Sequence, residues 1–371
     1  MTELTASSTR YLALDALRGL TIAMMILVNT PGSWEFIYPP FAHADWHGCT
    51  PTDLVFPFFL FVVGSAMYFA FHKVGAGESA QWRLPSMAGM IVRRSLIIFA
   101  LGLLFNGVLG GWENLRVMGV LQRISIAYAI AACIVLSVNR FAIYLIGVIM
   151  LLGYWALLLL GGGDDPFSLT GNSVVLLDLK LIGSDHMYSG KGVPFDPEGL
   201  LSTIPAVVNV LIGFEVARFL VSQPDRIYSL KVLLLLGVAG ILAGLLWSIW
   251  LPINKSLWTS SFVVYSAGYF CIALALFVWL MDIKQQPSIA KPLIIYGSNA
   301  IFIYMLAPFW VHAYQFILIG NSKITFYEFL YGSLAHVFPP AMASFYFALL
   351  HVLLFWCVSW WLYRNKLFIR V

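Results

Sequence analysis

A histidine, an asparagine and an aspartate lie close together near the start of the chain, in a combination suited to proton transfer. His43 lies in a loop within HADWHG, Asn29 ends the apolar run before this loop, and Asp53 begins the apolar run after it. An imidazole titrates near neutral pH, and a neighbouring carboxylate and amide suit it to work as a general base. A loop histidine is often only solvated, and the six other histidines are competing candidates. They are His47, His72, His186, His312, His336 and His351.

The elements that position these residues must lie in a membrane. Of the 371 residues, 61% are hydrophobic and only 10% are charged, and the mean hydropathy is +0.87. A soluble domain has about a quarter of its residues charged. Because too few polar side chains remain to cover a water-facing surface, the composition predicts an integral membrane protein.

Ten apolar runs are long enough to span a bilayer, for which about 17–25 residues are needed. They lie near 13–30, 52–72, 88–110, 116–137, 141–161, 199–221, 230–250, 258–280, 292–319 and 341–363. The ninth is long enough to tilt or break, and Pro308 predicts a kink in it. The first residues lack the apolar core of a signal peptide, so we expect the first run to be retained. The sequence therefore predicts an all-α polytopic protein with a single transmembrane domain over residues 1–371.

The distribution of basic residues predicts the orientation. With the N-terminus in the cytoplasm, fifteen of the 21 lysines and arginines fall in cytoplasmic segments, five fall in external segments, and Arg123 lies within the fourth run. This bias follows the positive-inside rule and places both termini in the cytoplasm. The two long loops, near 31–51 and 162–198, are then external. Because they contain Trp, Tyr, His and Asp, we expect ordered loops that cap a cavity.

Some classes of partner find no support in the sequence. No basic run with interleaved aromatic residues indicates nucleic-acid binding. No CxxC or HExxH spacing indicates a metal site, and the four cysteines are scattered. Lipid and a small molecule are the expected partners, and a homo-oligomer stays open.

Four segments carry a resemblance to a known family, and two later stretches fit it. They are LDALRGLTIAMMILVN at 14–29, HADWHGCTPTDLVFPFFLFVVG at 43–64, RVMGVLQRISIAY at 116–128 and FDPEGLLSTIPA at 195–206, followed by INKSLWTSSFVVYSAG at 253–268 and GSNAIFIY at 297–304. In order and spacing they resemble the heparan-alpha-glucosaminide N-acetyltransferase family of transmembrane acyltransferases, including its shorter bacterial relatives. The resemblance implies an acetyl-CoA-dependent N-acetyltransferase of the bacterial inner membrane.

The resemblance also implies roles for individual residues. The family's active-site histidine lies in an H-A-x-W segment, here His43, and the asparagine that ends the preceding helix is Asn29. We add Asp53 to this catalytic group. The family takes acetyl-CoA from the cytoplasm and the sugar amine from the opposite face. Two departures leave polysaccharide specificity unsupported: we expect no counterpart of the luminal domain of the animal enzymes, and the motif continues with His47 and Gly48.

Further candidates follow from the two substrates. Arginines suit the phosphates of acetyl-CoA, although two neighbouring ones could simply anchor a helix, and Arg123 could instead pair with an acid. The candidates for acetyl-CoA are Arg18, Arg93, Arg94, Gln122 and Arg123. Carboxylates bind sugar hydroxyls and an aromatic face packs on a sugar ring, although acids also favour a helix start. The candidates for the amino sugar are Asp196, Glu198, Lys255 and Trp258.

The main alternative is a membrane carrier for an amino sugar such as N-acetylglucosamine. Inverted repeats would favour a carrier, and none is evident in the sequence. A third class, a flippase-like or structural membrane protein, leaves the group of His43, Asn29 and Asp53 unexplained. For the enzyme, we expect direct attack of the amine on the thioester rather than an acetyl-histidine intermediate, and the acceptor sugar stays open.

Overall fold

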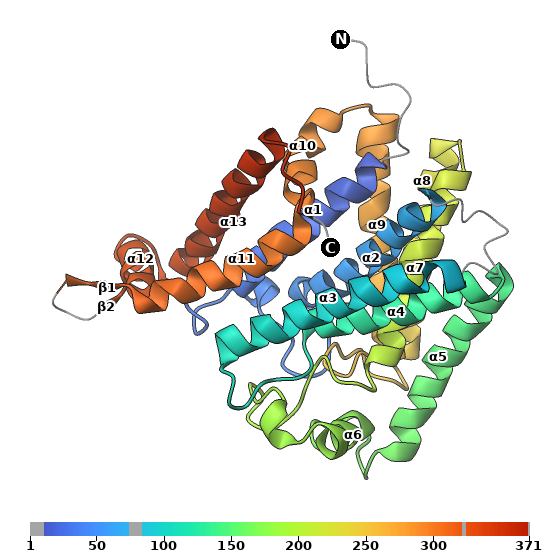
Figure 1. The fold of residues 1–371 in the computed structure, drawn as a ribbon, viewed down its shortest axis with the longest axis horizontal. Coiled ribbons are helices and arrows are strands. Elements are labelled where there is room, and N and C mark those ends of the chain that lie inside the picture. The colour runs from blue at the N-terminus through green and yellow to red at the C-terminus, as the bar shows by residue number, and fades with distance from the viewer. Residues whose placement is uncertain (1–10, 74–83, 321–323, 370–371) are drawn as a thin grey trace.

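The computed structural model of the protein describes residues 11–73, 84–320 and 324–369. Within them, nine helices are long and apolar enough to cross a membrane, and a bent pair of helices forms a tenth candidate span. The predicted all-α fold of about ten membrane helices is confirmed. The nine helices are α1 (Leu12–Asn29), α2 (Val55–Lys73), α3 (Leu84–Gly110), α4 (Val120–Ser137), α5 (Arg140–Gly161), α7 (Thr203–Ser222), α8 (Arg226–Trp247), α9 (Ser260–Val278) and α13 (Pro340–Arg364) (Figure 1).

The ninth apolar run forms two helices instead of one. α10 (Pro287–Gly297) and α11 (Ala300–Ala313) are bent by 65° relative to each other. The break therefore lies earlier than Pro308, which is contained in α11. Asn299, at the break, is buried, and its side-chain amide donates to the carbonyl of Leu367 at 3.1 Å and accepts from the backbone of Ile369 at 2.7 Å. The break is thus fixed by the segment that follows α13.

Shorter elements connect the spanning helices. They are α6 (Ser173–Leu181) in the loop after α5, and a hairpin of β1 (Leu318–Ile319) and β2 (Ile324–Thr325) followed by α12 (Phe326–Ala335). Figure 1 shows the hairpin and α12 projecting from the side of the bundle near α13. A short 3-10 turn (Pro51–Leu54) precedes α2, and it contains Asp53.

Glycines let α2 and α7 approach closely, which fixes the helix that follows Asp53. A Cβ atom on Gly64 would lie 1.9 Å from the carbonyl oxygen of Val210, and one on Gly213 would lie 2.0 Å from that of Phe61. Only glycine fits at such contacts, and membrane helices commonly pack through small residues because lipid provides no hydrophobic drive between them. The Ser65 hydroxyl adds a 3.0 Å hydrogen bond to the carbonyl of Gly213.

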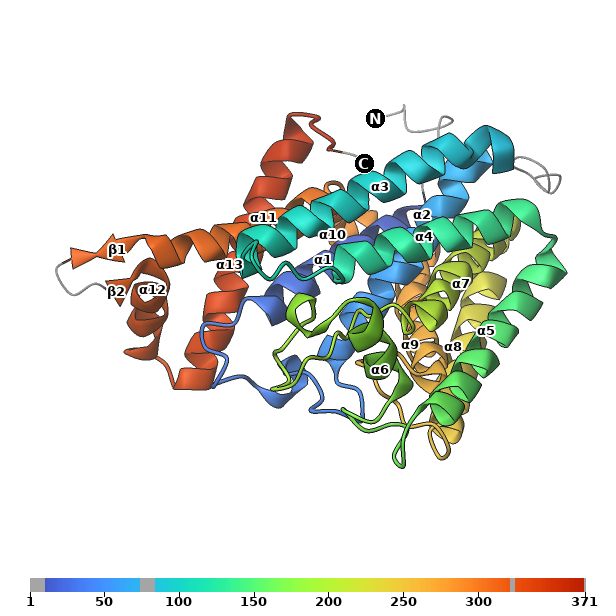
Figure 2. The ribbon, with the colours of Figure 1, turned by 60° about the horizontal axis from the view of Figure 1, so that its bottom comes forward.

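Three loop segments meet at one end of the bundle, which we call the loop end. They are residues 30–54, 162–202 and 248–259. The Trp46 indole donates to the carbonyl of Phe167 at 2.8 Å, and the backbone of Gly48 donates to that of Ile253 at 2.7 Å. Figure 2 shows α6 and the loop between α1 and α2 together below the bundle. Because these segments bond to one another, they form an ordered cover in which the candidate residues are held.

Candidate active site

A cavity of about 300 Å³ lies at the loop end, between the loop segments and the ends of α1, α2 and α4. Its apolar walls include Phe56, Phe59 and Tyr304. Polar side chains from distant parts of the sequence also face it, among them Asn29, His43, Asp53, Arg116, Glu198 and Lys255. Five of the residues predicted from the sequence therefore surround one cavity.

The carboxylate of Asp53 orients the ring of His43. One oxygen, Oδ2, accepts from the backbone of Ala44 at 3.1 Å and from the backbone and hydroxyl of Thr50 at 3.0 and 3.1 Å. The other oxygen, Oδ1, lies 2.7 Å from Nδ1 of His43. An ionised carboxylate can only accept, so Nδ1 must carry the hydrogen, which leaves the lone pair on Nε2. The His43 side chain is 45% exposed and that of Asp53 only 2%, so the imidazole is the member of the pair that solvent and ligands can reach.

Lys255 joins this pair from a loop more than two hundred residues away in the sequence. Its ammonium nitrogen lies 3.1 Å from Nδ1 of His43 and 3.5 Å from Oδ1 of Asp53. Burial lowers the pKa of Lys255 from its ordinary value, although the charges of Asp53 and Glu198 act in the opposite direction. Lys255 therefore lies within ion-pair distance of the buried carboxylate of Asp53 and directly beside the imidazole.

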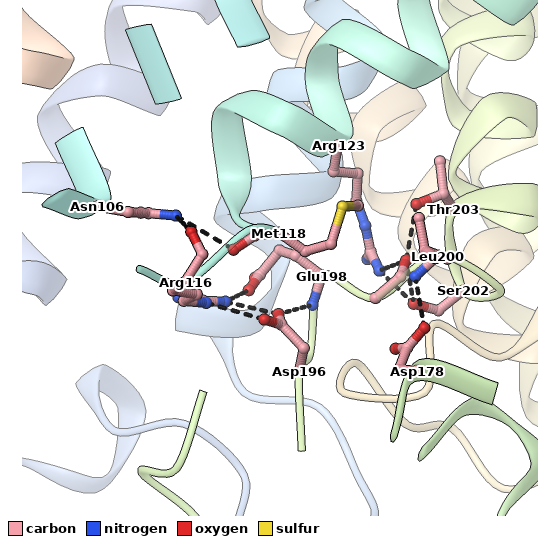
Figure 3. A network of polar contacts seen from close by, with 11 residues as sticks. Asn106, Arg116, Met118, Arg123, Asp178, Asp196, Glu198, Leu200, Ser202 and Thr203 are labelled. Carbon is pink, nitrogen blue, oxygen red and sulfur yellow. Dashed lines mark hydrogen bonds and ion pairs between the residues drawn. The ribbon is translucent and has the colours of Figure 1, made fainter. Parts of the chain in front are cut away.

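Arg116 organises the acidic wall of the cavity, and the sequence reasoning assigned it no role. Its guanidinium forms two bonds to Asp196, of 2.9 and 2.7 Å, and a third of 2.6 Å to Glu198 (Figure 3). Burial alone would raise the pKa of Glu198, but the charges of Arg116, Arg123 and Lys255 outweigh it and lower that pKa. Glu198 is therefore a carboxylate at the cavity wall, whereas Asp196 is buried behind it. The two acids of the D-x-E sequence at 196–198 are the feature of the sequence that could have indicated a basic partner such as Arg116.

Arg123 and Trp258 support the site from outside the cavity. The guanidinium of Arg123 is completely buried, bonds to Ser202 and to the carbonyl of Gly199 at 3.3 Å, and lies 4.8 Å from the ring centre of Trp258. The Trp258 indole is also buried and donates to Asn209 at 2.8 Å. Arg123 thereby holds residues 199–202, which connect Glu198 to the start of α7 (Figure 3).

The remaining candidates for acetyl-CoA do not gather at one point. Arg18 forms a 3.2 Å ion pair with Asp15 on α1, and Arg93 is exposed on α3. Gln122 is buried against Gly102 of α3. Arg94 lies 4.8 Å over the ring of Tyr128 and lines a second cavity of about 50 Å³. Of these four residues, Arg94 is the one that lines either of these two cavities.

The competing histidines have other surroundings. His47 contacts the amide of Asn254 at 3.3 Å, and His186 and His351 bond to backbone carbonyls at 2.9 and 2.8 Å. The side chain of His72 lies outside the described residues. Among the histidine side chains that are described, His43 is the one paired with a carboxylate. In the described ranges no group of three or more His, Cys, Asp or Glu side chains is arranged to hold a metal ion.

Comparison with known proteins bears on what this arrangement does. A sequence model of the family described as "Domain of unknown function (DUF5009)" matches residues 10–207, more than half of the chain and including His43, Arg116 and Glu198. The chain belongs to the DUF5009 family. The matched region runs from α1 into α7, so it carries most of the polar wall of the cavity but not Lys255.

Two curated proteins of known name are similar to this DUF5009 protein. The human heparan-alpha-glucosaminide N-acetyltransferase is 26% identical over 360 residues, covering 82% of this chain and 53% of the human protein. The mouse heparan-alpha-glucosaminide N-acetyltransferase is 25% identical over 358 residues, covering 81% of this chain and 53% of the mouse protein. The predicted resemblance is confirmed. The chain spans about half the length of these relatives.

Proposed function

We propose that this protein transfers an acetyl group from acetyl-CoA to the amine of a small amino sugar. The observation that carries the proposal is the 2.7 Å contact between Nδ1 of His43 and Asp53 at the wall of a cavity of about 300 Å³. The names of the two relatives support the N-acetyltransferase activity and a glucosamine-like acceptor. In this proposal the protein lies in a bacterial inner membrane with its loop end outside the cytoplasm.

The reaction needs one base and one donor for the developing negative charge. The amine nitrogen attacks the thioester carbonyl, so that a C–N bond forms and the C–S bond breaks. Nε2 of His43 accepts the proton that the amine loses and passes it to the departing thiolate, giving an amide and free CoA. Asn29 lines the same cavity, and its amide forms no hydrogen bond with another described residue. We assign it the role of donor to the oxyanion.

The acidic wall suits an amino sugar. Glu198 is ionised and faces the cavity, so it can hold the ammonium or a hydroxyl of the acceptor, and Lys255 can donate to a hydroxyl. Trp46 offers an aromatic face at the same cavity. We assign Asp196, Arg123 and Trp258 a supporting role, because they hold Glu198 and α7 from behind. The cavity volume is at the lower end for ligand sites, in keeping with a single sugar.

The donor reaches the site from the opposite end of the bundle. Acetyl-CoA is strongly anionic and cannot enter hydrocarbon, so its nucleotide stays at the cytoplasmic face in this proposal. Arg94 lies deeper than the cavity on α3 and is the arginine we assign to the donor, with Arg93 beside it at the helix surface. Gln122 and Arg18 are weaker candidates for binding the donor, because Gln122 is packed against α3 and Arg18 is paired with Asp15.

Purified protein, labelled acetyl-CoA and glucosamine test the proposal. His43→Ala is expected to lose acetyl transfer and to keep acetyl-CoA binding, because the nucleotide is held away from the loop end. His47→Ala is the matched control, since His47 lies in the same loop and does not line the cavity. Uptake of the sugar without acetylation would instead indicate a carrier. Full activity of His43→Ala would overturn the assignment of the base.

A further inference from the structure

The site cavity and the smaller cavity beside Arg94 share two wall residues. Phe59 of α2 and Tyr304 of α11 line both. Their rings meet edge to face, with centroids 6.1 Å apart and an interplanar angle of 69°. Such a pair is in direct contact and leaves no open path between its rings. The two cavities are therefore neighbours separated by an aromatic partition.

The second cavity continues the first toward the opposite end of the bundle. On α4, Val120 lines the site cavity, whereas Leu121, Ile124 and Tyr128 line the second one. Val120 and Tyr128 are about 12 Å apart along the axis at the helical rise of about 1.5 Å per residue. On α2 the lining passes in the same direction, from Phe56 through Phe59 to Val63.

The lining of the second cavity is apolar apart from its far end. Val63, Ile98, Leu121 and Ile124 contribute hydrocarbon, and Arg94 contributes the positive charge. The buried Nε of Arg94 has no hydrogen-bond partner among the described residues. A narrow apolar space that ends at a guanidinium suits an extended uncharged arm with an anionic end.

Tyr304 contacts two aromatic rings, through the edge contact with Phe59 and through a stacked contact with Phe105 of α3 whose centroid lies 5.7 Å away. It lies near the start of α11, directly after the 65° break that separates α11 from α10. Rotation of the Phe59 or Tyr304 side chain about its own χ angles would part the two rings and leave α10 and α11 in place.

We propose that Phe59 and Tyr304 form a gate between the acceptor cavity and a passage for the arm of the acyl donor. The inference rests on the proposed function for the identity of the arm. The closed rings separate the acceptor side from the donor side, and they part when the thioester passes toward His43. The gate keeps water and small solutes from crossing the protein along this path between turnovers.

Thiol accessibility tests the gate without any need for activity. Val63→Cys places a thiol in the second cavity of a full-length protein from which the four native cysteines have been removed. The protein is reconstituted in sealed vesicles, and a membrane-impermeant methanethiosulfonate reagent is added at the loop end. With the native gate we expect slow labelling. Phe59→Ala is expected to raise the labelling rate about tenfold or more, because the barrier to entry is removed, and Phe59→Leu, which keeps more of the packing, should raise it less.

Phe58→Ala is the matched control. Phe58 is the neighbouring residue on α2, it packs on Phe270 of α9, and it lines neither cavity. We expect it to leave the labelling rate unchanged. Equal labelling in the native, Phe59→Ala and Phe59→Leu backgrounds would overturn the gate, as would an equal rise in Phe58→Ala. If the native protein transfers acetyl groups and the thiol at position 63 is labelled at the same rate in the Phe59 variants as in the native background, the gate is wrong and the proposed function stands. If Phe59→Ala raises the labelling rate and the native protein transfers no acetyl group, the gate stands and the proposed enzyme activity fails.

Discussion

Asp53→Asn replaces one carboxylate oxygen with an NH₂ group, and it should move the proton of His43 from Nδ1 to Nε2. The asparagine amide can be placed in two ways. If its NH₂ group took the place of Oδ2, it would meet three donors, the backbone groups of Ala44 and Thr50 and the Thr50 hydroxyl. If it took the place of Oδ1, it would meet Nδ1 of His43 and the ammonium of Lys255. The second placement keeps three hydrogen bonds and is therefore favoured.

In that placement the asparagine donates to Nδ1, so the hydrogen of His43 moves to Nε2 and the base is lost. The wrong histidine tautomer lowers turnover by about ten-thousandfold in the serine-protease triad, and we expect a loss of about a thousandfold or more here. The assay compares kcat for glucosamine acetylation with the affinity for acetyl-CoA, which should not change. Asp45→Asn, an exposed position in the same loop, is the control. If Asp53→Asn kept a tenth or more of the native turnover by that measure, the role of Asp53 in orienting the ring would be refuted.

Three further predictions follow from the same structure. Asn29→Ala should lower turnover by about a hundred- to a thousandfold at unchanged acetyl-CoA affinity if it serves the oxyanion, and an unchanged kcat would remove that role. Burial raises the pKa of Asp178 to about 6, above the value of the unfolded chain, so its stabilising contribution is present below about pH 4 and is lost as the pH rises through 6. Relative to the native protein, Asp178→Asn should therefore increase the free energy of unfolding by roughly 2 kcal/mol more at pH 8 than at pH 4. Thermal unfolding of both proteins at both pH values measures this, and an identical pH dependence of stability in the two proteins would contradict it. An impermeant thiol reagent outside the cell should label Lys180→Cys and not Gln286→Cys, and the reverse pattern would invert the proposed orientation.

The helices could be predicted because lipid leaves an apolar run of this length few alternatives. A backbone without water must satisfy its own hydrogen bonds, so each run becomes a helix whatever its neighbours are. A break in the ninth run was expected, but at the wrong position. Its position depends on the contact of Asn299 with the segment after α13, and Asn299 is 68 residues from Leu367, whose carbonyl it binds. Local sequence contains no sign of that contact.

The site could be predicted only in part, for a related reason. His43 and Asp53 are ten residues apart, so the loop between two helices brings them together. Lys255 is 212 residues from His43, and it was predicted as a residue that binds the sugar, not as a neighbour of His43. Arg116 received no role because its acidic partners were interpreted as sugar ligands or helix caps. Arg123 and Trp258 were both expected at a substrate, and the structure packs them on each other, since helical spacing does not reveal which face of α4 meets a neighbour.

Initial rates over a matrix of acetyl-CoA and glucosamine concentrations, with labelled N-acetylglucosamine as the product, test the central claim most directly. Direct transfer at His43 predicts labelled product, double-reciprocal lines that intersect, and no acetyl group retained by protein incubated with acetyl-CoA alone. Parallel lines with an acetylated His43 would contradict direct attack. The absence of labelled product from protein that binds acetyl-CoA would contradict the acetyltransferase itself.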